Sequence, residues 1–345
     1  MFLSLLVLPP FAVSGQNAPP QQSGTDRRIT LVVQVTDKSG APVRGLQERD
    51  LTLLDDKQPQ KIVAFQAVNS EAPAAKDPPI EVVLVVDAIN TPFQALSYER
   101  DEVKKFLLQN GGKLVWPVSL IIFSEDGTKV NGSSRDGNAV AGALDKYVTG
   151  LRPGNLTNGG YHGAVERMEG SLNALLSMVN YEKTKPGRKL MIWIGPGWPL
   201  FSQTHSGLTS KQDQHFFDLI VTASTGLRQA HMTLYSVDQL GLSNTGGMHI
   251  TYYENFLKGV KSPSQVLPGD LGVQVLAVQS GGRVLNSSND VAGAIANSVA
   301  DADAFYVLSF DSVPADHTDE YHALQVTVDK PGMTARTRTG YYDQR

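Results

Sequence analysis

Hydrophobic and polar positions follow two different patterns along this chain. Between residues 80 and 311, continuous apolar runs alternate with segments of helical spacing. Glu81–Asp87 (EVVLVVD), Val118–Ser124 (VSLIIFS) and Lys189–Gly195 (KLMIWIG) are apolar almost throughout, which indicates strands buried on both faces. Strands that alternate with helices are typical of right-handed crossovers. The pattern therefore predicts an α/β fold: a doubly wound, mainly parallel sheet with helices on both faces.

The segments between these strands have the periodicity of amphipathic helices. Tyr161–Val179 is the longest, with apolar residues repeating every three or four positions. Further helices are expected over residues 97–109, 138–148, 211–229, 270–279 and 291–302, and further strands over residues 232–238, 281–286 and 305–310. We expect the last of these strands to complete the α/β domain, which spans residues 80–311.

The two flanks of this domain have the alternating pattern of antiparallel strands. Ile29–Thr36 (ITLVVQVT) and Tyr321–Val328 (YHALQVTV) are rich in β-branched residues and are followed by turn residues. Neither flank is long enough to bury a core of its own. We therefore predict that residues 28–70 and 320–343 pair with each other and form one small antiparallel β subdomain.

The first residues resemble an export signal. Met1–Val13 is apolar and is followed by the small residues Ser14 and Gly15, a pattern typical of secretory signals and too short for a membrane span. Arg27 is the first basic residue, so the usual positive charge before the apolar run is missing. We expect a signal peptide over residues 1–15, a flexible leader over 16–27, and a protein exported to the periplasm or the medium.

Composition excludes several classes of function. The chain has 345 residues with a net charge of −4, so no basic surplus is present to bind nucleic acid. Cysteine is absent, which excludes disulfides, cysteine-ligated metals and a thiol nucleophile. We also find no G-x-S-x-G, P-loop or H-E-x-x-H motif. The sequence therefore predicts a protein without enzymatic activity, and an unrecognised hydrolase is the weakest alternative.

Four segments in this order resemble the von Willebrand factor A-like fold. EVVLVVDAINT places Asp87 at the end of the first buried strand, and PGNLTNGGYHGAVERM is a glycine-rich loop that leads into a helix. KLMIWIGPG ends a further strand, and SGGRVLNSSNDVAGAIANSVADADAFYVLSF matches the closing run of the fold. The flanks VTDKSGAPVRGLQERDLTLLDDKQPQKIVAF and TARTRTGYY are similar to the VWFA-related family first described from Acidobacteria, over roughly residues 28–343.

The resemblance implies a metal-ion-dependent adhesion site on the loops after these strands. In metal-binding members, Asp-x-Ser-x-Ser on the first loop, a threonine on the second and an aspartate on the third surround Mg²⁺, Mn²⁺ or Ca²⁺. Here Asp87, Thr91 and Thr157 occupy three of these positions, whereas Ile89 and Pro196 offer no side-chain oxygen.

A cation at these loops would have only one carboxylate, from Asp87, at the expected positions. Asn90 is a local candidate for an additional ligand, and Asp238, at the end of another strand, is a candidate for the missing acid. Because few charged ligands remain, we expect a degenerate site with at most weak divalent-cation binding, in which Asp87 caps neighbouring backbone. Trp198 follows the third loop and is a candidate exposed anchor for a ligand, with packing against a neighbouring loop as the alternative.

These observations lead to one functional expectation and one alternative. We expect an exported, non-enzymatic binding or adhesion module that recognises a protein partner, with Asn90 and Trp198 as ligand-binding residues. The alternative is a metal-independent structural scaffold subunit of an envelope assembly. The oligomeric state and the identity of the ligand do not follow from the sequence.

Overall fold

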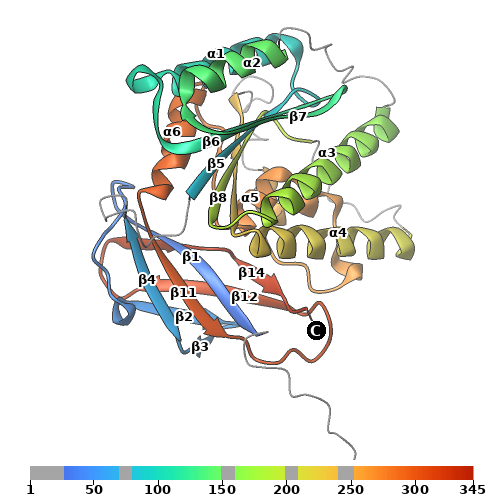
Figure 1. Cartoon of the computed structure of the whole chain (residues 1–345). Coiled ribbons are helices and arrows are strands. Elements are labelled where there is room, and N and C mark those ends of the chain that lie inside the picture. The colour runs from blue at the N-terminus through green and yellow to red at the C-terminus, as the bar shows by residue number, and fades with distance from the viewer. Residues whose placement is uncertain (1–26, 70–79, 149–159, 199–208, 240–251, 345) are drawn as a thin grey trace, which may run out of the picture.

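The computed structural model describes residues 27–69, 80–148, 160–198, 209–239 and 252–344 (Figure 1). For residues 160–162 it describes the backbone alone. The predicted signal peptide and all of the leader except Arg27 lie outside these residues. None of the described helices has both the length and the apolar character needed to cross a membrane.

Six strands form a central sheet in the order β10-β9-β8-β5-β6-β7. Five of them run parallel, and β7 is antiparallel to β6 at one edge. The bounds are β5 Ile80–Asp87, β6 Lys113–Ser124, β7 Gly127–Asp136, β8 Arg188–Ile194, β9 Met232–Val237 and β10 Val284–Leu285. The predicted central, mainly parallel sheet with flanking helices is therefore confirmed.

Helices cover both faces of this sheet, as Figure 1 shows. One face carries α1 Phe93–Leu107, α2 Gly137–Val148 and α6 Val291–Val299, and the other carries α3 Gly160–Lys183, α4 Ser210–Gln229 and α5 Val273–Gln279. In β5, side chains alternate between the two cores: Val82, Leu84 and Val86 face α1, whereas Val83 and Val85 face α3 and α4. Burial on both faces explains why β5 is apolar throughout.

Two further four-stranded sheets lie beside the α/β part, with a third hydrophobic core formed by residues of both. Their strand orders are β13-β1-β11-β4 and β14-β12-β2-β3. The bounds are β1 Arg28–Asp37, β2 Leu51–Asp55, β3 Gln58–Gln60, β4 Ala64–Asn69, β11 Ala304–Asp311, β12 Tyr321–Val328, β13 Met333–Arg336 and β14 Gly340–Tyr342. β1 pairs with β13 and β2 with β12, so strands from the two flanks of the chain are neighbours.

β11 differs from the sequence expectation, which placed residues 305–310 in the sheet of the α/β domain. It pairs instead with β1 and β4 in the first flanking sheet. The alternation of its side chains explains the position: Phe305 enters the core beside α1 and α6, whereas Tyr306, Leu308 and Phe310 enter the core between the two flanking sheets. Side chains of β11 therefore contribute to two hydrophobic cores, the one beside α1 and α6 and the one between the two flanking sheets.

Short helical turns complete the described elements. They are η1 Glu48–Asp50, η2 Gln109–Gly112, η4 Tyr252–Phe256, η5 Pro263–Gln265, η6 Pro268–Leu271 and η7 Ala300–Ala302. In η6, the carboxylate of Asp270 accepts a hydrogen bond from the backbone N–H of Leu267 at 2.7 Å. Asp270 is 4% exposed, and this burial raises its pKa to about 7 against the opposing effect of that hydrogen bond.

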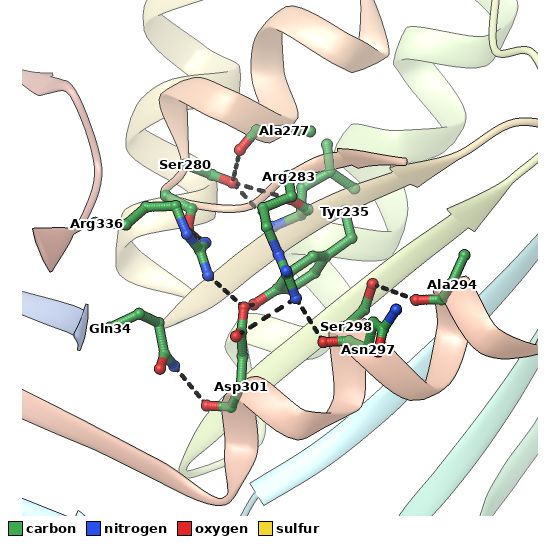
Figure 2. A network of polar contacts seen from close by, with 12 residues as sticks. Gln34, Tyr235, Ala277, Ser280, Arg283, Ala294, Asn297, Ser298, Asp301 and Arg336 are labelled. Atoms are coloured by element: carbon green, nitrogen blue, oxygen red, sulfur yellow. Dashed lines mark hydrogen bonds and ion pairs between the residues drawn. The ribbon is translucent and has the colours of Figure 1, made fainter. Parts of the chain in front are cut away.

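The carboxylate of Asp301, directly after α6, joins the α/β part to the flanking sheets (Figure 2). It accepts a hydrogen bond from the Tyr235 hydroxyl of β9 at 2.7 Å and forms an ion pair with Arg336 of β13. Arg283, beside β10, lies 3.5 Å from the other carboxylate oxygen. Asp301 is 4% exposed, so these contacts are made away from water.

The backbone carbonyl of the same residue makes two more connections. It accepts hydrogen bonds from the Gln34 side chain of β1 and from Arg188 of β8, the latter at 2.8 Å. Arg188 is 3% exposed, and its guanidinium lies over the Phe305 ring at 4.2 Å. One residue thus contacts β1, β8, β9 and β13.

Asp301→Ala should therefore destabilise the protein strongly. Removal of one partner from a buried ion pair leaves a charge without compensation, which costs about 3–5 kcal/mol. Urea unfolding followed by circular dichroism measures the change. The control is Asp311→Ala, which removes an exposed pair with Arg28 and should have little effect. Equal unfolding midpoints for the two variants would contradict the role of Asp301.

Asp270→Asn should stabilise the protein at pH 8 more than at pH 5. Because the pKa of Asp270 is about 7 when folded and about 3.9 when unfolded, its ionisation favours the unfolded chain. The contribution of Asp270 to stability is therefore fully present below about pH 4 and is lost as the pH rises to 7. Urea unfolding at both pH values tests this.

The control for this pH dependence is Asp37→Asn. Hydrogen bonds from Ser39 and Ala41 lower the pKa of Asp37, so it is ionised at both pH values in both states. Its replacement should change stability equally at pH 5 and pH 8. If Asp270→Asn also shows no difference between the two pH values, its carboxyl group does not titrate in this range.

Candidate functional site

The candidate site lies where the direction of chain progression through the central sheet reverses. From β5 the chain continues to β6 on one side, whereas β8 lies on the other side. In open α/β sheets, ligands bind at the carboxyl ends of the strands next to such a point. The loops that follow β5 and β8 meet here, and they carry Asp87, Asn90, Thr91 and Pro196.

Asp87 is the last residue of β5, and its side chain is completely buried. Oδ1 accepts hydrogen bonds from the backbone N–H of Ile89 at 3.1 Å and of Asn90 at 3.0 Å. The Asn90 amide donates to both oxygens, and the Trp193 indole N–H donates to Oδ2 at 3.0 Å. Burial raises the pKa of Asp87, and these hydrogen bonds oppose the rise. The carboxylate thus shapes its own loop.

Trp193 was not among the expected site residues. It lies inside β8, and its ring is part of the core, where it makes edge contacts with Phe123 and Trp198. Its position in an apolar strand suggested packing only. A buried indole requires an acceptor for its N–H. Trp193 pairs with Val85 of the neighbouring strand β5, and Asp87 follows two residues later on the same face. That requirement is the signal that sequence reasoning could have used.

Asn90 and Thr91 both lie at the site but are closed in by other residues. Asn90 is 6% exposed, and its amide also donates to the Ser171 hydroxyl of α3 at 3.0 Å. Asn90 Oδ1 is buried and makes no hydrogen bond with the described residues. Thr91 is 2% exposed, and Gly195 lies against it: a Cβ added to Gly195 would come within 2.7 Å of Thr91 Oγ1.

The loop after β8 is fixed by α5. Gly195 has φ +129°, a conformation that other residues rarely adopt, and the carbonyl of Pro196 accepts a hydrogen bond from Gln274 at 3.0 Å. A Cβ on Gly197 would overlap Val273 at 2.2 Å. The loop is therefore held by tight packing at the position where the family pattern has an acid. Thr157, the expected ligand from the second loop, lies outside the described residues.

Trp198 corrects one expectation. It was a candidate exposed anchor, but it is 1% exposed and belongs to the core beside Trp193. Its indole N–H donates to the backbone carbonyl of Leu271 at 2.8 Å. The Trp198 ring can be buried because the Leu271 carbonyl, at the end of η6, accepts a hydrogen bond from the indole N–H, which is the only polar group of the side chain. Trp198 therefore has no surface for a ligand.

A second buried acid lies near Asp87 and was missed by sequence reasoning. Glu99 of α1 is completely buried, and its pKa is raised well above its usual value by burial and by the charges of Asp87 and Asp238. The Gln239 side chain donates to it at 3.4 Å. Within the described residues, Asp87, Glu99 and Asp238 do not gather their oxygens closely enough to form a three-ligand metal group.

Phe93 is an exposed apolar side chain at this edge. It is the first residue of α1, directly after the β5 loop, and is 55% exposed. Phe93 lies in the first turn of α1, before the buried residues of this helix, which include Leu96, Val103 and Leu107. Aromatic side chains are enriched in protein–protein interfaces relative to the rest of the protein surface.

Comparison with protein-family models and with characterised proteins finds no match for this chain. Among solved structures, an aerotolerance-related membrane protein from Bacteroides fragilis aligns at 13% identity and a TM-score of 0.36, over 64% of this chain and 98% of that one. The pilus adhesin SpaC from Lactobacillus rhamnosus GG gives 14% identity and 0.38, over 90% of this chain and 42% of that one.

The PilB minor pilin from Streptococcus sanguinis aligns at 10% identity and a TM-score of 0.39, over 67% of this chain and 64% of that one. This chain therefore spans less than two thirds of PilB and less than half of SpaC. Similarities of this size carry no functional information.

Asp87→Ala should lower stability whether or not Mg²⁺ is present. The substitution leaves the Trp193 indole buried without its acceptor and removes one of the two acceptors of the Asn90 amide, at about 1–3 kcal/mol for each lost hydrogen bond. Urea unfolding in millimolar Mg²⁺ and in a chelator measures both effects. Asp145→Ala, which removes a partly exposed pair with Lys104, is the control. A large Mg²⁺ stabilisation of the wild type that disappears in Asp87→Ala would instead identify Asp87 as a metal ligand.

Proposed function

We propose that this chain is an exported, non-enzymatic binding or adhesion module built on a von Willebrand factor A-like domain with a degenerate metal-ion-dependent adhesion site. The strand order supports this fold, because five parallel strands with one antiparallel edge strand carry their loops to one edge. The observation that carries the proposal is the state of Asp87: both of its oxygens accept hydrogen bonds from neighbouring residues.

A cation at this edge would have to displace several of these hydrogen bonds. Mg²⁺ demands near-ideal octahedral geometry, and Ca²⁺ needs six to eight oxygens. Asp87 would have to give up the Asn90 amide and the Trp193 indole, and Pro196 would contribute no carboxylate. We therefore place the module among those that recognise a protein partner without a bridging metal.

Recognition without a metal requires side chains that can bury apolar area. Phe93 provides such a surface at the same edge as Asp87, and the exposed Gln94 lies beside it. Burial of a large aromatic side chain in a partner's pocket contributes about 2–3 kcal/mol. We place the partner's contact surface at the start of α1.

Capture of a partner from the envelope fraction of the source organism tests this proposal. The wild type should retain the same partner in Mg²⁺ and in EDTA, and Phe93→Ala should weaken the binding about 30-fold or more, as measured by biolayer interferometry. Val115→Ala is the matched control, because Val115 is 62% exposed near the start of β6, at the opposite edge of the sheet.

Three results would contradict parts of this proposal. Elution by EDTA would show that recognition depends on a cation. Equal binding by Phe93→Ala and the wild type would exclude the start of α1 as the contact surface. Self-association as the only interaction would favour the alternative, a metal-independent scaffold subunit of an envelope assembly.

A further inference from the structure

A second group of potential metal ligands lies at one end of the sheet formed by β14, β12, β2 and β3. Asp55 is the last residue of β2, Asp56 begins the turn to β3, and His322 is the second residue of β12. Ligand atoms of these three side chains lie within 4.8 Å of one another. The two acids are separated from His322 by more than 260 positions in sequence, and the pairing of β2 with β12 brings them together.

The geometry of this group matches a coordination site. His322 Nδ1 is 3.2 Å from Asp55 Oδ1 and 3.8 Å from Asp56 Oδ2. Ligand atoms about 2.0–2.1 Å from a tetrahedral zinc ion lie roughly 3.3 Å from one another, which is within this range. Asp55 and His322 are buried, whereas the Asp56 side chain is 44% exposed, so the group is closed on one side and open to solvent on the other.

Neighbouring groups hold the two buried ligands in place. The Tyr341 hydroxyl donates to Asp55 Oδ2 at 2.9 Å, which leaves Oδ1 directed toward His322. The imidazole stacks on the Tyr341 ring, with centroids 4.8 Å apart and an angle of 15°. Asp56 Oδ1 accepts the backbone N–H of Ala323 at 3.2 Å, and its Oδ2 faces the imidazole. In metal sites, contacts of this kind orient the side chains that coordinate the ion.

The buried members of the group are incompletely compensated. The His322 side chain is 8% exposed, and its Nε2 has no hydrogen-bond partner among the described residues. Among the described residues, Asp55 forms an ion pair with His322 and none with a lysine or an arginine. Buried carboxylates and imidazoles normally have their polar atoms satisfied. A cation bound to Asp55 Oδ1 and His322 Nδ1 would offset the charge of Asp55.

We propose that Asp55, Asp56 and His322 form a divalent transition-metal site suited to Zn²⁺. Mg²⁺ and Ca²⁺ favour sets made only of oxygen ligands, whereas an imidazole with carboxylates suits zinc. Three protein ligands leave the fourth position to water, on the side where Asp56 is exposed. The ion links the hairpin of β2 and β3 to β12 and so connects the two flanking segments of the chain.

Calorimetric titration of the full chain with ZnCl₂ tests this site, with MgCl₂, CaCl₂ and MnCl₂ as comparisons. We expect one Zn²⁺ per chain at micromolar affinity or tighter, and binding at least 100-fold weaker for Mg²⁺ and Ca²⁺. His322→Gln should lose the binding. Because His322 is buried and its variant can misfold, Asp56→Asn at the exposed ligand is the second variant, and it should weaken Zn²⁺ binding at least tenfold.

Two measurements separate this site from adventitious zinc. His317→Gln changes an exposed histidine five residues away and should bind Zn²⁺ as the wild type does. Co²⁺ substitution should give the visible absorption of a four-coordinate ion in the wild type and in His317→Gln, but not in Asp56→Asn. Equal Zn²⁺ affinity of Asp56→Asn and the wild type, or the absence of saturable one-to-one binding, would show that the three side chains only hydrogen-bond to one another.

Discussion

The arrangement of the whole molecule depends on the buried carboxylate of Asp301. Its oxygens satisfy a tyrosine from the central sheet and an arginine from the flanking sheet, and its backbone carbonyl binds two further side chains. Because an unpaired charge in this position would be very unfavourable, these groups can be satisfied together only when both parts of the molecule pack in this one orientation. The polar network therefore specifies how two hydrophobic cores are placed side by side.

The same principle acts at the carboxyl edge of the central sheet, with a different result. There, the donors around Asp87 come from its own loop and from the neighbouring strand β8, so the acid stabilises the loop. At the end of β2, Asp55 has two side-chain donors and a second acid beside it. Fewer protein donors therefore reach the carboxylate of Asp55 than that of Asp87.

The sequence predicted most elements of the α/β part, because strands such as β5 are apolar on both faces and its helices are strongly periodic. It did not predict the position of β11. The apolar pattern of this strand fits the central sheet as well as a flanking sheet, and only the direction of side chains such as Phe305 distinguishes the two positions. For the site, position along the chain placed Asp87 and Asn90 at the end of β5, where the structure also has them, and their roles in binding stay predictions. The burial of Trp198 depends on a distant carbonyl at Leu271, and no local pattern records such a contact.

The way the α/β part is inserted into the flanking sheets has a mechanical consequence. The chain leaves these sheets after β4 and returns at β11, and β4 and β11 are hydrogen-bonded neighbours. Tension between residues 27 and 344 would therefore pass through β1, β11 and the strands paired with them, and it would bypass the central sheet. A loop carried by that sheet, such as the one after β5, would keep its shape while the flanking strands bear the load.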